Sequence, residues 1–313
     1  MRLAATASVV PPGRLAVEDC VMAAGQPPVE ARAFRRIFGI DEVRVWPRDA
    51  GFDGILCGLL DDLEADGAAP PDALIYVHAC PLHAIPAAAA LQSPRGVHRF
   101  LGRVDQVWEM DQNCCATLFW ALEAARNMLR RGTAHSILIV AGESFSDMTA
   151  ADRYMPACTV LGDAYTAMVV DGGAGGLRIS DIVLRSNPEF HFGLYATDAE
   201  VNAFNRAQVR LTADVLDGMR FRHDAGEPIL PHNINRFIWD QYCAASGTPR
   251  GQVWLNLLVG FGHCCSTDAF LGIDRFLRDE DADSAVLVGV GQGGFVGGCR
   301  VSKPGRGGAH AAG

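Results

Sequence analysis

The chain has 313 residues, of which 49% are hydrophobic, and its 27 Lys and Arg against 36 Asp and Glu give a formal net charge of −9. This composition predicts a large buried core, and the acidic balance argues against nucleic acid or an anionic membrane as the main partner. No apolar run reaches the roughly 18 residues of a membrane span. The N-terminus lacks the basic-then-apolar order of a secretion signal, so we expect a cytoplasmic protein.

Alternating strands and helices are predicted along the first half of the chain. Apolar runs and turn residues place strands at 1–10, 43–46, 73–78, 136–141 and 165–170, and helices at 28–38, 51–66, 85–93 and 115–131. The run at 73–78 is almost continuously apolar, as expected of a parallel strand covered on both faces. The pattern therefore predicts an α/β fold.

A glycine-rich segment at 172–176 is the best candidate for a boundary between two halves. Beyond it we expect strands at 177–184, 253–259 and 284–290, with helices between them. The predicted division is 1–172 and 173–302, followed by a Gly/Ala-rich tail, 303–313, that we expect to be disordered.

Two adjacent cysteines, Cys114 and Cys115, stand at the start of the helix predicted at 115–131, which Gly132 ends as a left-handed cap. A cysteine in the first turn lies at the positive end of the helix dipole, where the thiolate is favoured. This position suits a nucleophile. The ten cysteines include no CxxC pair, so most are expected to be reduced and buried, and we predict no metal site.

An internal similarity links the two halves. The stretch 113–117, Asn-Cys-Cys-Ala-Thr, resembles 263–267, His-Cys-Cys-Ser-Thr, and each precedes a helix and then a buried strand. Two copies of one β-α-β arrangement suggest duplicated halves around a pseudo-twofold axis, with the two helix starts facing each other. Chance similarity over five residues is the alternative.

Three further stretches offer what a thiol nucleophile needs. Pro231–Asn235 contains His232 before a helix, and Gly260–His263 ends in a second histidine. Gly291–Phe295 is a glycine turn after a strand, whose exposed amides could stabilise an oxyanion together with the N–H of Cys115. Each of these signals is weak alone.

Taken in order, these stretches resemble the β-ketoacyl-ACP synthase III family, the thiolase-fold condensing enzymes that initiate fatty acid and polyketide synthesis. The similarity covers nearly the whole chain. It is carried by His83–Pro86, Cys115–Leu122 with Gly132, Leu161–Ala164, Pro231–Asn235, Gly262–Cys265 and Gly293–Gly297.

The resemblance implies a thiolase-like fold of duplicated halves in α-β-α-β-α layers. It implies acyl transfer from coenzyme A or an acyl carrier protein, as a thioester substrate, with no permanently bound cofactor, in a homodimer. The implied catalytic residues are Cys115, His232 and His263, with the N–H groups of Cys115 and Gly293 as the oxyanion hole. The implied substrate-binding residues are Ile85, Asn235 and Phe295, of which Ile85 would line the partner's acyl pocket.

Two departures from the family pattern leave alternatives open. The segment from Asp111 to the nucleophile is one residue short, so that Cys115 is favoured by the helix register while Cys114 is a second candidate. The family's catalytic asparagine is His263 here, and a Cys-His-His set is similar to elongating relatives that decarboxylate malonyl units. Decarboxylative condensation is therefore expected. The alternatives are acyl transfer to an alcohol or amine, and a non-catalytic partner subunit similar to chain-length factors.

Overall fold

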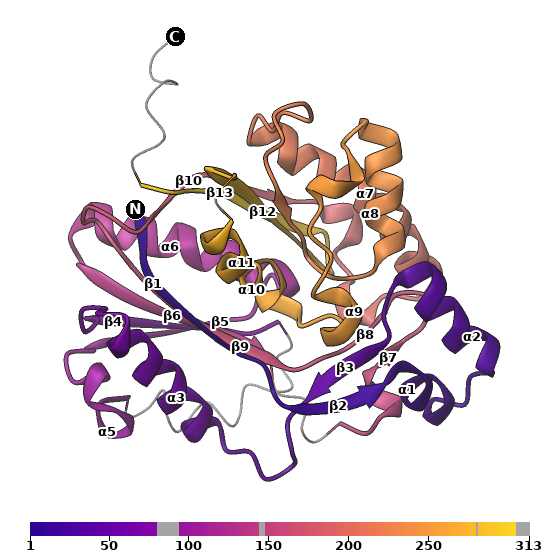
Figure 1. Ribbon diagram of the computed structural model, residues 1–313, viewed down its shortest axis with the longest axis horizontal. Coiled ribbons are helices and arrows are strands. Elements are labelled where there is room, and N and C mark those ends of the chain that lie inside the picture. Colours follow the sequence, from indigo (N-terminus) through magenta and orange to yellow (C-terminus); the bar gives the residue numbers. More distant parts are fainter. Residues whose placement is uncertain (80–93, 144–147, 280, 305–313) are drawn as a thin grey trace.

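A nine-stranded mixed sheet runs through the protein (Figure 1). The computed structural model describes residues 1–79, 94–143, 148–279 and 281–304. The strands of the first half are β1 (Arg2–Val9), β4 (Ala73–Val77), β5 (Gln106–Met110), β6 (Ser136–Glu143) and β9 (Ala164–Asp171). Those of the second half are β10 (Leu177–Ser186), β11 (Ile229–Leu230), β12 (Ser284–Gly291) and β13 (Phe295–Ser302). Two small ribbons pair β2 (Gly13–Ala16) with β3 (Glu42–Val45) and β7 (Tyr154–Met155) with β8 (Thr159–Val160).

The two halves repeat one strand order. In the first, β5, β4 and β6 are parallel, β9 is antiparallel to β6, and β1 is antiparallel to β9. In the second, β11 and β12 are parallel, β13 is antiparallel to β12, and β10 is antiparallel to β13. Antiparallel pairing of β1 with β10 joins the halves into one sheet. The repeat confirms the predicted duplication, while the boundary at residue 172 stays a prediction.

The helices are α1 (Val17–Ala23), α2 (Pro28–Ala33), α3 (Phe52–Ala65), α5 (Pro94–Val97), α6 (Thr117–Arg131), α7 (Asp198–Gly218), α8 (Arg236–Ser246), α9 (Leu258–Phe261), α10 (Asp268–Leu271) and α11 (Ile273–Arg278). A π-helical turn, η1 (Phe34–Phe38), continues α2. Short 3₁₀ turns include η5 (Cys114–Ala116), which leads into α6, and η10 (Cys265–Thr267), which leads into α10. The remaining 3₁₀ turns lie at Arg99–Leu101, Ala151–Arg153, Pro188–Phe190, Gly193–Tyr195 and Arg250–Gln252.

The helices form three layers, one between the two parts of the sheet and one on each outer side, and each layer packs on its own apolar core. The central core packs α6, α10 and α11 against inward residues of both halves, such as Ile139 and Leu287. The outer core of the first half packs α3 on Tyr76 and Val140, and that of the second packs α7 and α8 on Val288. Figure 1 shows α6, α10 and α11 between the two parts of the sheet, with α3 and α7 on opposite outer sides. The predicted α-β-α-β-α layering is therefore confirmed.

Local sequence explains where the main helices begin and end. Gly132 ends α6 with φ 68°, the left-handed conformation that glycine adopts at little cost. Thr197 and Glu200 form a reciprocal capping box at the start of α7. Gly132 thus fixes where α6 ends, and the cysteine pair lies in the 3₁₀ turn directly before this helix.

The strand predicted at 253–259 is wrong. Val253 makes only an isolated parallel bridge to Ile229, and the chain then turns into α9. Its neighbour β11 is only two residues long, because Pro231, which has no N–H to donate, follows it directly. The apolar residues of this run, such as Leu255 and Leu258, are instead buried in the outer core.

Two predictions fall on residues outside the described ranges. These are the helix at 85–93, with Ile85, and the tail beyond Pro304. Within the described part of the chain, no helix combines the length and apolar character needed to cross a membrane.

Candidate active site

The cysteine pair lies in the tight turn η5, immediately before α6. Cys114 has φ 52°, a left-handed conformation that costs a non-glycine residue about 1–2 kcal/mol. The Thr117 hydroxyl holds the turn by donating to the Cys114 carbonyl at 2.6 Å and accepting from the Asn113 N–H at 3.2 Å. Gly291 at the end of β12 makes the close packing possible, because a Cβ there would lie 2.1 Å from the Asn113 carbonyl oxygen.

A line of three side chains starts from Cys115. The Cys115 Sγ lies 3.3 Å from Nε2 of His263, and Nδ1 of the same ring lies 2.5 Å from Oδ2 of Asp268. His263 and Asp268 are both 2% exposed, whereas Cys115 is half-buried. The carboxylate accepts from Nδ1–H and so leaves Nε2 available to face the thiol. This is the nucleophile, base and orienting-acid geometry of hydrolase triads.

Asp268 also ties together two segments that are far apart in sequence. Its Oδ2 accepts from the backbone N–H of Asn233 at 2.7 Å, and its Oδ1 accepts from the N–H of Cys264 at 2.7 Å. The carboxylate therefore fixes the loop that follows His232 as well as the ring of His263. Charge-assisted hydrogen bonds of this kind are the strong ones in protein interiors.

His232 completes the group from the other side. Its ring meets that of His263 edge to face, with 5.3 Å between centroids, and Trp239 Nε1–H donates to its carbonyl at 2.9 Å. The structure thus brings together the three predicted catalytic residues, Cys115, His232 and His263. Of the two thiols in η5, Cys115 is the one that contacts a histidine.

The two histidines have opposite protonation preferences. Burial, reinforced by the charge of His263, holds the pKa of His232 well below its usual value of 6.5. Burial also opposes charge on His263, but the Asp268 carboxylate and Cys115 outweigh it and raise the pKa to about 10. At neutral pH His232 is therefore neutral and His263 is an imidazolium, which assigns different chemistry to each ring.

Two neighbouring thiols and burial make the largest contributions to the pKa of the Cys115 thiol. The Cys114 thiol lowers the pKa, but the Cys265 thiol and burial outweigh it and raise the pKa of Cys115 to about 12. Cys115 and His263 are in contact, so they titrate as a pair. Loss of one proton from this pair leaves a thiolate beside an imidazolium, the reactive form of a thiol nucleophile.

The backbone around His263 is fixed by the segment that follows β7. The His263 N–H donates to the Val160 carbonyl, and the Gly162 N–H donates to the His263 carbonyl, both at 3.0 Å. Gly262 has φ 69° and ψ −150°, a combination that is essentially restricted to glycine. The same segment carries Asp163, which forms a buried salt bridge with Arg153 at 2.9 Å.

The predicted binding residues each have their own local contacts in the structure. Gly293, with φ 93°, is in the β12–β13 turn, where it approaches the Phe295 ring and Gly193. Phe295 packs edge to face on Trp120 of α6, with 5.9 Å between centroids. Asn235 caps α8 by accepting from Ile238 N–H, and it donates to a carbonyl at residue 158. The predicted contacts of Gly293, Asn235 and Phe295 with a substrate stay predictions, and Ile85 lies outside the described residues.

The internal similarity is real in the backbone but shifted by one residue. The residue with positive φ that begins each 3₁₀ turn is Cys114 in η5 and Cys265 in η10, with φ 52° and 51°. The backbone thus matches Cys114 with Cys265, whereas the sequence pairs it with Cys264. The threonine hydrogen bonds keep the sequence pairing, because the Thr117 hydroxyl donates to the Cys114 carbonyl and the Thr267 hydroxyl donates to the Cys264 carbonyl.

Two buried carboxylates at the site were missed by sequence reasoning. Asp268 begins α10, where an acidic residue is expected simply to favour a helix N-terminus. Glu143, 1% exposed, accepts from the Ala79 N–H and from the Ser266 hydroxyl. The available signal was a charged residue directly after the apolar run 136–142.

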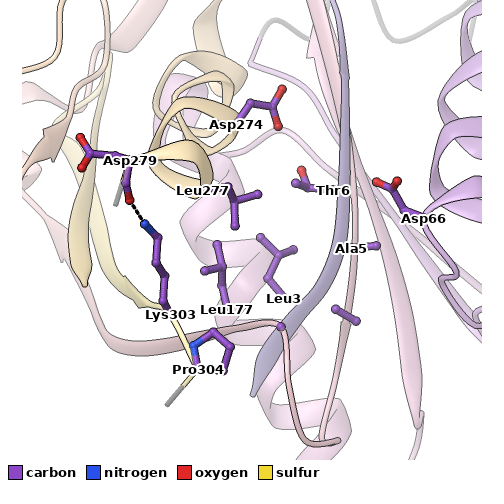
Figure 2. A pocket seen from close by; sticks show the side chains of 12 residues that line it. Leu3, Ala5, Thr6, Asp66, Leu177, Asp274, Leu277, Asp279, Lys303 and Pro304 are labelled. Carbon is purple, nitrogen blue, oxygen red and sulfur yellow. Dashed lines mark hydrogen bonds between the residues drawn. The ribbon is translucent and has the colours of Figure 1, made fainter. Parts of the chain in front are cut away.

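A cleft lies away from this group. It has a volume of about 690 Å³ and is lined by β1, by α11 and by the end of β13, including Leu3, Asp274 and Lys303 (Figure 2). None of the candidate catalytic residues lines it.

Near the triad, one donor atom each from Cys115, His263 and Cys265 lies within 4.8 Å of the others, a spacing that a metal ion could bridge.

Comparisons with known proteins find sequence similarity to one family. A family model described as 3-oxoacyl-[acyl-carrier-protein (ACP)] synthase III matches residues 110–188, which include η5 and α6. The β-ketoacyl-[acyl-carrier-protein] synthase III of Rhizorhabdus wittichii is 28% identical over 264 residues, covering 75% of this chain and 78% of that protein.

Solved structures share the fold over almost the full length. The β-ketoacyl-[acyl carrier protein] synthase III of Thermus thermophilus superposes with a TM-score of 0.78 and 20% identity, over 97% of this chain and 99% of that one. ChlB3, described as an acyltransferase, superposes with a TM-score of 0.74 and 19% identity, over 96% and 97%. The chain is therefore similar in sequence to β-ketoacyl-ACP synthase III proteins, and it shares the thiolase fold of the solved structures.

Proposed function

We propose that the protein is an acyltransferase of the ketoacyl-ACP synthase III type, which forms an acyl thioester on Cys115 and condenses it with a malonyl-type thioester. The observation that carries this proposal is the line from Cys115 Sγ through the His263 ring to Asp268, with His232 against the same ring. The donor would be an acyl-CoA or an acyl carrier protein, the substrates of the resembling family.

In the first step, the Cys115–His263 pair gives up one proton and the Cys115 thiolate attacks the thioester carbonyl carbon. A carbon–sulfur bond forms as the bond to coenzyme A or phosphopantetheine breaks, and the departing thiolate takes a proton from the His263 imidazolium. The N–H groups of Cys115 and Gly293 are the proposed oxyanion donors.

In the second step, a malonyl-type thioester loses CO₂ and its enolate carbon attacks the acyl carbon held on Cys115. As the carbon–carbon bond forms, the carbon–sulfur bond to Cys115 breaks and the Cys115 thiolate is released beside His263. Condensation needs hydrogen-bond donors at the enolate oxygen. Neutral His232 can supply an N–H, and so can His263 once it has regained a proton from solvent after the first step. The opposite pKa shifts support this division, since one ring stays neutral at the pH at which the other is charged.

The second candidate is direct acyl transfer to an alcohol or amine. After the first step His263 has given up a proton and can act as the general base for the acceptor. Asp268 supports this role, because it orients His263 as the aspartate of a hydrolase triad orients its histidine. ChlB3 illustrates that an acyltransferase can have this fold. The third candidate, a non-catalytic partner subunit, is disfavoured because the Cys115 thiol contacts the His263 ring and this ring contacts the Asp268 carboxylate.

Two measurements on one preparation separate these readings. Intact-mass spectrometry after incubation with a panel of acyl-CoA thioesters is expected to show one acyl adduct. CO₂ released from a malonyl thioester in proportion to product is expected for condensation. Product without CO₂ would establish the second candidate, and an absence of adduct with every donor would favour the non-catalytic subunit.

We extend the proposal to assembly and location. A homodimer in the cytoplasm, with an acyl-CoA or acyl carrier protein as the partner in catalysis, is what the resembling family implies for this chain. Sedimentation of the purified protein tests the dimer, and a monomer at micromolar concentration would contradict it.

A further inference from the structure

Three side chains of types that can bind a metal lie close together at the N-terminal end of α6. Sγ of Cys115, a ring nitrogen of His263 and Sγ of Cys265 all lie within 4.8 Å of one another. His263 and Cys265 are buried and Cys115 is half-buried. Sequence spacing could not predict this set, because 148 residues separate Cys115 from His263.

The distance between the Cys115 sulfur and the His263 nitrogen suits a zinc site. Zn–S bonds of about 2.3 Å and Zn–N bonds of about 2.0–2.1 Å at a tetrahedral angle place sulfur about 3.5 Å from nitrogen. The Cys115 Sγ and His263 Nε2 are 3.3 Å apart. Two thiolates and one imidazole form a Cys₂His set, which leaves a fourth position open to solvent or substrate.

The surroundings orient these ligands. His263 Nδ1 pairs with Asp268 at 2.5 Å, so Nε2 faces the thiol, and a carboxylate partner of this kind supports most metal-bound histidines. Cys265 is held in a left-handed backbone conformation, with φ 51°. The two thiols also share an apolar cluster with Ala79 and Leu161, a setting that favours soft sulfur ligands over hydrated hard cations.

We infer that Cys115, His263 and Cys265 form a binding site for Zn²⁺, and that the bound ion withdraws Cys115 from acyl transfer. Each thiol releases its proton to solvent as it coordinates, and the His263 imidazolium releases its Nε2 proton to solvent so that the neutral ring can donate the Nε2 lone pair. The ion occupies the nucleophile sulfur directly, so enzyme in the zinc-bound state is inactive until the metal is removed. This inference goes beyond the proposed function, because binding of zinc does not require acyl chemistry.

The test is a titration of the purified, chelator-treated protein with Zn²⁺ alone, in competition with a chromogenic chelator. Alkylation of Cys115 by iodoacetamide is followed in parallel by peptide mass spectrometry. One equivalent of Zn²⁺ is expected to bind and to protect Cys115. Loss of an outer partner costs about 10–100-fold in metal affinity, so Asp268→Asn should weaken binding by this factor and Cys265→Ser by at least as much.

Cys264→Ser is the matched control, because the Cys264 Sγ points to the Phe261 carbonyl and lies outside the set. Its affinity for Zn²⁺ should equal that of the unmodified chain. X-ray absorption at the zinc edge of the unmodified chain gives a readout that does not depend on how variants fold. Two sulfurs at about 2.3 Å with a nitrogen at about 2.0–2.1 Å are expected. A shell of nitrogen and oxygen only, or Zn²⁺ that binds without protecting Cys115, would overturn the inference.

Discussion

Replacing Asp268 by asparagine removes one charge at the centre of the site while keeping the side-chain shape. Oδ2 of Asp268 accepts from His263 Nδ1 and from Asn233 N–H, and Oδ1 accepts from Cys264 N–H. An amide can supply only one acceptor oxygen. Its NH₂ group must then replace one of the two oxygens. Facing the Cys264 N–H, it deprives one buried donor of its acceptor; facing the His263 side, it deprives both His263 Nδ1–H and Asn233 N–H.

The magnitude follows from these contacts. A buried donor left unsatisfied costs about 1–3 kcal/mol, and loss of one member of a buried ion pair costs about 3–5 kcal/mol. We therefore expect Asp268→Asn to lower the free energy of unfolding by about 2–5 kcal/mol. The equivalent change in a hydrolase triad, which lets the histidine adopt the wrong tautomer, slows the reaction by about 10⁴, and we expect acylation of Cys115 to slow by about 10²–10⁴.

Urea unfolding gives the stability, and stopped incubations with acyl-CoA read by intact mass give the acylation rate. Asp274→Asn is the matched control, because Asp274 is a partly buried carboxylate in the distant cleft (Figure 2). It should change stability by less than about 1 kcal/mol and leave acylation unchanged. Acylation of the folded Asp268→Asn variant at the unmodified rate would refute the role of Asp268 as the positioning residue for His263.

Three further predictions concern the same group. The pKa of His232 is depressed in the folded state, so below about pH 6.5 the unfolded chain binds a proton that the folded chain does not. The free energy of unfolding therefore falls on acidification by up to about 1.4 kcal/mol per pH unit. In urea titrations at several pH values, His232→Gln should flatten this slope. The pKa values of His263 and Cys115, about 10 and about 12, predict that iodoacetamide alkylation of Cys115 accelerates as pH rises toward 10, and a rate independent of pH would contradict the pairing. Gly291→Ala places a Cβ 2.1 Å from the Asn113 carbonyl oxygen and should destabilise the protein by about 1–3 kcal/mol, whereas Gly51→Ala, with nothing within 4 Å, should not.

The parts of the fold that sequence predicted well are those with local causes. The buried strands β4, β6 and β12 appear as continuous apolar runs, and Gly132 ends α6 by backbone freedom alone. The run at 253–259 shows the limit of that reasoning. Its apolar residues are buried as expected. Whether they form a strand depends on how long the neighbouring strand β11 is, and the residues at 253–259 carry no information about that length.

The sequence predicted which residues belong to the site better than it predicted which of them are in contact. His232 and His263 were found because their short motifs resemble those of a known family. Asp268 was missed because an aspartate at a helix start has an ordinary explanation, while its real partners include Asn233, 35 residues away. Contacts over such separations follow from the duplicated fold, and no local signal in the sequence encodes them.

The central claim is that Cys115 carries the acyl group. Its most direct test is peptide mapping of the adduct after incubation with acyl-CoA, in the unmodified chain and in the Cys115→Ala and Cys114→Ala variants. The structure predicts an acyl group on Cys115, retained in Cys114→Ala and lost in Cys115→Ala. An adduct mapped to Cys114, or one that persists in Cys115→Ala, would contradict it.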